Sequence, residues 1–297
     1  MNDVTASGYQ EGWYTSQDGL RLFYRDYPGP PDAPGDAHPR TVVLCLPGVS
    51  RNSKDFAQLA ERLSRRYRVL CPDLRGRGLS AYDPDPDNYI LPIYVNDVRH
   101  LLAATGVEHT HVIGTSLGGI IAMGMALSMP TVLASAVLND IGPEVGLENL
   151  RDIIDYMKDE SPLPGWGAVE EHVRTAFLRN LPNGTEDDWR RIARNTYKET
   201  ADGVFVHAFD QGIVRQFERA LTMKFDLWPM FRALGSIPLL TLRGALSGIL
   251  MPETLERMQA AMPDMTSLTV ADRGHPPLLS EPEVLEAIDA HLARAFC

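Results

Sequence analysis

The chain has 297 residues, of which 44% are hydrophobic and 23% charged, a composition within the ordinary range for a globular protein. Its 39 acidic and 28 basic residues give a net charge of −11 at pH 7, which repels polyanions, so nucleic acid is not expected as a partner. The polar first ten residues lack a secretory pattern, and no apolar run approaches the roughly 20 residues of a spanning helix. We therefore expect a soluble, cytoplasmic protein that works without a membrane, with free thiols at Cys45, Cys71 and Cys297.

The amino-terminal part predicts an antiparallel start to a sheet. Residues 12–15 and 20–27 flank Asp18-Gly19, a dipeptide typical of hairpin turns. The Pro- and Gly-rich stretch 28–39 is expected to form a surface loop.

From residue 41 onward, short apolar runs alternate with segments of helical periodicity. The expected strands are 41–46, 68–71, 111–113, 134–138, 238–242 and 267–270. The expected helices include 56–63, 94–102 ending near Gly106, 119–129 ending before Pro130, and 282–295. This alternation predicts an α/β fold with a doubly wound, mostly parallel sheet of about eight strands.

Between the strands 134–138 and 238–242 the alternation stops. The segment 142–234 contains helical stretches rich in aromatic residues and no strong strand pattern. We expect a core made of residues 1–141 and 235–297, with 142–234 inserted as a helical cap above the sheet.

A candidate nucleophile lies in Gly114-Thr115-Ser116-Leu117-Gly118, between an expected strand and an expected helix. A sharp strand-to-helix turn needs small residues on both sides of a strained residue, and it raises the serine Oγ above the sheet. The helix amino terminus that follows also favours a developing negative charge. Ser116 is therefore the expected nucleophile.

A serine hydroxyl needs a general base. His275 is the best placed of the eight histidines, because it lies in a Gly- and Pro-rich loop after the last expected strand. His207 lies on the inserted segment, and one hypothesis for it is that it lines the pocket; the alternative is a structural or exposed histidine.

The loop after the strand 41–46 is expected to complete an oxyanion hole. Gly48 permits close approach of the backbone, so the Val49 and Leu117 amides are the expected donors. Arg51 follows this loop directly, and it either binds a substrate carboxylate or carbonyl or is a solvated loop arginine.

These motifs together resemble the α/β-hydrolase superfamily over nearly the whole chain: the segment around Ser116, the Pro47-Gly48 loop, the polar stretch 73–80 and the loop of His275. The stretch 73–80 is expected to be structural, with its Asp and Arg side chains tying turns together. Within the superfamily the chain is most similar to bacterial capped hydrolases such as enol-lactone hydrolases and ring-cleavage-product hydrolases. Related dehalogenases and epoxide hydrolases carry Asp where this chain has Ser116.

The sequence departs from the family where the catalytic acid usually stands. The segment 243–250 resembles the acid-bearing one, but Gly248 occupies the expected position of Asp. Asp140, after the strand 134–138, is the best replacement, because some members of the superfamily place their acid there. The alternative is that Asp140 caps the first turn of the inserted segment.

These observations predict a serine hydrolase that cleaves a small to medium carboxylic ester or lactone. Ser116, His275 and Asp140 are its expected triad, and the aromatic-rich insertion suggests an apolar site for a small molecule. No metal or organic cofactor is implied, since no cluster has ligand spacing. The alternatives are a carbon–carbon bond hydrolase and a catalytically silent receptor, the latter suggested by Gly248.

Overall fold

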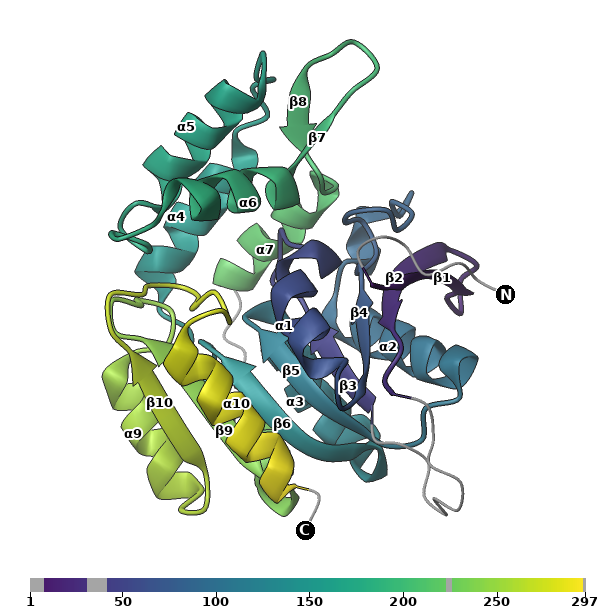
Figure 1. The fold of residues 1–297 in the computed structure, drawn as a ribbon, viewed down its shortest axis with the longest axis vertical. Coiled ribbons are helices and arrows are strands. Elements are labelled where there is room, and N and C mark those ends of the chain that lie inside the picture. The colour runs from purple at the N-terminus through teal and green to yellow at the C-terminus, as the bar shows by residue number, and fades with distance from the viewer. Residues whose placement is uncertain (1–7, 31–41, 223–225, 296–297) are drawn as a thin grey trace.

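The computed structural model describes residues 8–30, 42–222 and 226–295 of the chain. Its main sheet has eight strands in the order β1-β2-β4-β3-β5-β6-β9-β10 (Figure 1). This confirms the predicted fold class. The strands are β1 (Gln10–Thr15), β2 (Arg21–Tyr27), β3 (Val42–Leu46), β4 (Arg68–Pro72), β5 (Thr110–Thr115), β6 (Leu133–Asn139), β9 (Leu239–Gly244) and β10 (Thr266–Val270).

The first two strands form the predicted hairpin around Asp18-Gly19. Thr15 pairs with Arg21, and Gly19 has a φ of +87°, which suits glycine at this turn. β2 also pairs antiparallel with β4, whereas the strands from β4 to β10 pair in parallel. Every residue of β3 and β5 is buried, as expected where helices cover both faces of a parallel sheet.

Two layers of helices cover the sheet. One face packs against α1 (Ala57–Leu63) and α10 (Pro282–Arg294). The other packs against α2 (Leu91–Thr105), α3 (Leu117–Ser128), α8 (Trp228–Ala233) and α9 (Pro252–Ala261). α9 is absent from the helices that the sequence predicted.

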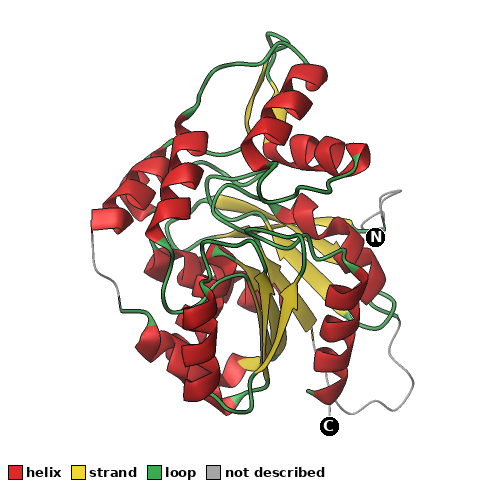
Figure 2. Cartoon of the chain, turned by 90° about the vertical axis from the view of Figure 1, so that its left-hand side faces the viewer, coloured by secondary structure: helices red, strands yellow, loops and turns green. Residues whose placement is uncertain are grey.

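Residues 142–234 leave the sheet after β6 and return before β9. They contain α4 (Leu147–Lys158), α5 (Trp166–Phe177), α6 (Glu186–Thr196), α7 (Gly212–Thr222) and α8. Figure 1 shows α4, α5 and α6 above the end of the sheet, and Figure 2 shows helices above that end from another side. The segment has an apolar cluster of its own, which includes Val169, Val173 and Trp189.

The inserted segment also holds a small hairpin that the sequence pattern did not reveal. β7 (Tyr197–Glu199) pairs antiparallel with β8 (Phe205–His207). Strands this short are too brief to show an alternation of apolar and polar residues.

Cys45 and Cys71 are buried free thiols, as expected. Cys297 and most of the predicted loop 28–39 lie outside the described residues. Within the described ranges, none of the helices has both the length and the apolar character needed to cross a bilayer.

Candidate active site

Ser116 lies in a strained turn between β5 and α3. Its φ is +51°, a value that side-chain-bearing residues rarely adopt, and its amide donates to the Asn139 carbonyl at 3.0 Å. The flanking glycines are required because a side chain has no room at either position. A Cβ at Gly114 would lie 2.4 Å from the Gly118 oxygen, and a Cβ at Gly118 would lie 2.0 Å from the Leu46 oxygen. The turn therefore packs directly against β3, as the motif requires.

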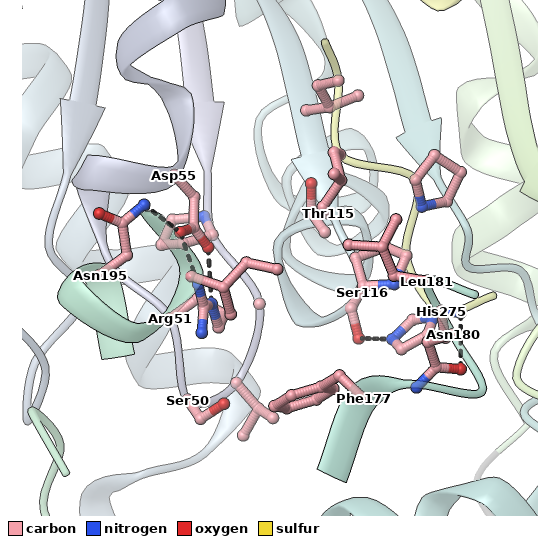
Figure 3. Close-up of a pocket in the computed structure, with 18 of the residues that line it drawn as sticks. Ser50, Arg51, Asp55, Thr115, Ser116, Phe177, Asn180, Leu181, Asn195 and His275 are labelled. Carbon is pink, nitrogen blue, oxygen red and sulfur yellow. Dashed lines mark hydrogen bonds and ion pairs between the residues drawn. The ribbon is translucent and has the colours of Figure 1, made fainter. Parts of the chain in front are cut away.

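The structure brings the three predicted triad residues together, although they come from three different loops. Figure 3 shows the contact between Ser116 and His275. His275 Nε2 lies 2.9 Å from Ser116 Oγ, and its Nδ1 lies 2.7 Å from Asp140 Oδ2. His275 is only 8% exposed and Asp140 is fully buried. This chain of hydrogen bonds can pass a proton from the serine to the imidazole while the carboxylate orients the ring.

Asp140 is held in place by donors on the loop after β9. Its Oδ1 accepts from the Gly244 amide at 2.9 Å, and its Oδ2 accepts from the Ser247 hydroxyl at 2.6 Å. It does not cap α4, whose N-cap residue is Gly146. Asp140 thus faces His275, and it does not have the alternative role of a helix cap.

Gly248 is close to α4. A Cβ at this glycine would lie 2.5 Å from Asn149 Cγ. The loop after β9 has Gly248 where a carboxylate was expected. It instead supplies hydrogen-bond donors, from Gly244 and Ser247, to the carboxylate of Asp140 after β6.

The predicted oxyanion donors lie beside the nucleophile. A Cβ at Gly48 would be only 3.7 Å from the Ser116 Cβ, so the loop after β3 touches the turn after β5. Among the described residues, neither the Val49 nor the Leu117 amide has a hydrogen-bond acceptor. The buried Arg77 donates to the Val49 carbonyl at 2.8 Å and so fixes this loop.

A cavity of about 140 Å³ opens onto Ser116 and His275. Its roof comes largely from the inserted segment and is mostly apolar, with side chains from α4, the end of α5, the loop after α5 and α6. These are Ile153, Tyr156, Phe177, Leu181 and Ile192.

The far side of the cavity carries a polar cluster around Arg51 (Figure 3). The Arg51 Nε and Nη2 donate to the two carboxylate oxygens of Asp55, each at 2.7 Å, and Nη1 donates to the Thr196 hydroxyl. Asn195 Nδ2 also donates to Asp55 at 2.9 Å. Burial lowers the pKa of Arg51, but the Asp55 carboxylate outweighs it, so the net pKa is raised. Arg51 is thus neither a solvated loop residue nor an unpaired cation.

The stretch 73–80 is structural, as expected. Asp73 accepts from the Ser53 and Leu79 amides, and Arg75 forms buried ion pairs with Asp83 and Asp97.

His207 does not line the cavity. It stacks on Phe209 with ring centroids 4.8 Å apart, and burial lowers its pKa to about 4. A second histidine–serine cluster is buried where β5 pairs with β6, and its His111 Nδ1 and His291 Nε2 lie 2.8 and 3.0 Å from Ser135 Oγ. Ser135 has no exposed surface, so this cluster offers no access to a substrate.

Several residues of the site were not found by sequence reasoning. Gly244 and Ser247 support Asp140, and Asn139 joins two loops by donating to Thr115 Oγ1 and the Pro277 carbonyl. Asn180, in the inserted segment, contacts the loop of His275. Single polar residues in loops carry no sequence pattern that could reveal such contacts. Across the described ranges, no group of three or more His, Cys, Asp or Glu side chains could hold a metal ion.

Comparisons with known proteins identify the family of the chain. The model of the alpha/beta hydrolase family matches residues 43–288. A 3-hydroxybutyrate-oligomer hydrolase from Cupriavidus necator is 32% identical over 276 residues, 88% of this chain and 89% of that protein. A 2-(acetamidomethylene)succinate hydrolase from Mesorhizobium japonicum is 28% identical over 79% of this chain and 81% of its own. The crystal structure of an alpha/beta hydrolase from Novosphingobium aromaticivorans is 39% identical, with a TM-score of 0.89 over 97% of this chain and 99% of that one.

Proposed function

The chain belongs to the alpha/beta hydrolase family, and on that premise we propose that it is a serine hydrolase that cleaves a small to medium carboxylic ester or lactone. The observation that carries the proposal is the hydrogen-bonded chain Ser116–His275–Asp140 at the floor of a cavity. The fold without these contacts would not indicate a reaction.

In the proposed reaction, Ser116 Oγ attacks the ester carbonyl while His275 Nε2 takes its proton. The bond between the carbonyl carbon and the alkoxy oxygen then breaks, and His275 gives the proton to the leaving alcohol. Water adds to the acyl-enzyme with His275 again as the base, which releases the acid and restores Ser116. The Val49 and Leu117 amides hold the oxyanion in both steps.

Asp140 is the proposed acid of the triad. By accepting from Nδ1–H of His275 it leaves the Nε2 lone pair directed at Ser116, and it stabilises the imidazolium that forms. Chemistry of this kind needs no cofactor, and we propose none.

The cavity supports a small substrate with a largely apolar body. An ester is further supported by the relative from Cupriavidus necator, which is named for hydrolysis of 3-hydroxybutyrate oligomers. We propose Arg51 and Gly48 as binding residues. Because Asp55 balances the charge of Arg51, a neutral polar group of the substrate fits that end better than a carboxylate.

We propose further that residues 142–234 act as a cap on a core of residues 1–141 and 235–297. The apolar roof of the cavity and the separate hydrophobic cluster of the segment support this division. A cytoplasmic location remains part of the proposal, and small molecules are the only partners proposed.

The decisive experiment is an activity panel of a chromogenic short-chain ester, a lactone and a ring-fission dienone, each with the wild type and Ser116→Ala. We expect turnover of the ester or lactone that is lost in the variant. Turnover of the dienone alone would indicate that the enzyme hydrolyses carbon–carbon bonds and not esters. Binding without turnover of any of the three would favour a silent receptor.

A further inference from the structure

Asn180 lies in the loop between α5 and α6, and its backbone is held from two sides. Its amide donates to the Phe177 carbonyl at 2.9 Å, and its carbonyl accepts from the Gly274 amide at 2.7 Å. A Cβ at Gly274 would lie 2.3 Å from Asn180 Oδ1, so glycine is required for this approach. The inserted segment is thus fixed directly against the loop that carries the general base.

The orientation of the Asn180 side chain follows from its contact with His275. The His275 backbone amide donates to Asn180 Oδ1 at 3.3 Å, and an N–H donor must face the oxygen end of a carboxamide. The NH2 end therefore points away from that loop. Figure 3 shows the oxygen of Asn180 on the dashed line to His275 and its nitrogen on the opposite side.

The N–H donors of this NH2 group are available to a bound molecule. Asn180 lines the same cavity as Ser116, together with the apolar side chains of Phe177 and Leu181. No acceptor for Asn180 Nδ2 is present among the described residues. A donor beside apolar side chains binds an acceptor more strongly than it would in water, because the local dielectric is low.

We propose that Asn180 is a specificity-determining residue whose NH2 group donates a hydrogen bond to a carbonyl oxygen in the leaving-alcohol part of the substrate. This inference rests on the proposed ester hydrolysis. His275 must protonate the leaving alkoxy oxygen, so the alcohol part lies on the side of His275, where Asn180 is attached. The preferred substrates are then esters of hydroxy-carbonyl compounds.

The test compares 3-oxobutyl acetate with 3-methylbutyl acetate, in which a methyl group replaces the ketone oxygen. The measured quantity is the ratio of kcat/KM for the two esters, in which general effects on the triad cancel. We expect wild type to prefer the ketone and Asn180→Ala to lower the ratio about tenfold, the effect of one lost hydrogen bond in an apolar site. Asn180→Asp keeps an acceptor for the His275 amide but has no NH2 group, so it should lower the ratio similarly.

Asn183→Ala is the matched control, because Asn183 is an exposed amide of the same loop that donates to Asp272 and does not line the cavity. It should leave the ratio unchanged. A ratio that is unaltered in both Asn180 variants would overturn the inference, as would an equal fall in Asn183→Ala.

A second pair places the oxygen on the acyl side: ethyl 3-oxobutyrate and ethyl 3-methylbutyrate. A preference that depends on Asn180 only with this pair would also overturn the assignment to the alcohol part.

Measurements of binding test this inference independently of the proposed reaction. The dissociation constants of the two acetates are measured on Ser116→Ala protein, with and without Asn180→Ala. If wild type hydrolyses none of the esters, the proposed function fails, yet the ratio of dissociation constants still decides whether Asn180 selects the ketone.

Discussion

Replacing Asp140 by Asn tests the proposed acid of the triad most directly. The Gly244 amide donates to Oδ1 of Asp140, so the oxygen of an asparagine would keep that place. Its NH2 group would then face His275 Nδ1, where wild type has an acceptor 2.7 Å away. An NH2 group donates to Nδ1 and forces the imidazole proton onto Nε2, which can then no longer accept from Ser116.

The wrong tautomer should lower kcat by roughly 10³ to 10⁴, as loss of the orienting carboxylate does in other triads. At about 1.4 kcal/mol for each factor of ten, this corresponds to about 4 to 6 kcal/mol of transition-state stabilisation. The assay is steady-state hydrolysis of a chromogenic short-chain ester, with thermal unfolding of each variant as a check on the fold.

Gly248→Asp is the matched variant, because it restores a carboxylate to the loop after β9. Its Cβ would meet only the end of the Asn149 side chain, and Asp140 already occupies Nδ1 of His275, so we expect no gain in activity. A nearly silent Asp140→Asn together with a sharp rise in Gly248→Asp would refute the reasoning.

Three further predictions concern the nucleophile, the polar end of the cavity and stability. Ser116→Ala should lower ester turnover by several orders of magnitude, and a serine-directed phosphonate should label Ser116 alone in wild type; a label elsewhere would contradict the assignment. The double variant Arg51→Ala/Asp55→Ala should lower kcat/KM for acidic and neutral esters equally, because the pair that it removes carries no net charge, and a loss confined to acidic esters would restore the carboxylate-binding role. Burial lowers the pKa of His111 and His291 to about 4 from 6.5, so stability is complete above pH 6.5 and falls as the pH drops towards 4. Urea unfolding should show a loss of about 2 kcal/mol per histidine between pH 7 and 5, and equal stability at the two values would contradict it.

The sequence alone predicted those parts of the molecule that local rules control. The hairpin at Asp18-Gly19, the buried parallel strands and the helix ending at Gly106 follow from turn chemistry and periodicity. The turn at Ser116 is predictable for the same reason, since its glycines are needed by contacts within a few residues and with β3.

Periodicity failed where elements were short. The strands β7 and β8 have three residues each. Neither gives a pattern that stands out from a loop.

Only the tertiary structure decided how the loops combine. Asp140 and His275 are 135 positions apart, and their contact depends on the parallel pairing that brings the carboxyl ends of β6, β9 and β10 to one edge. The same pairing places Ser247 on the carboxylate and leaves Gly248 against α4. The sequence contains all these residues, but the distances between them depend on the packing of the sheet and the inserted segment, which no local pattern encodes.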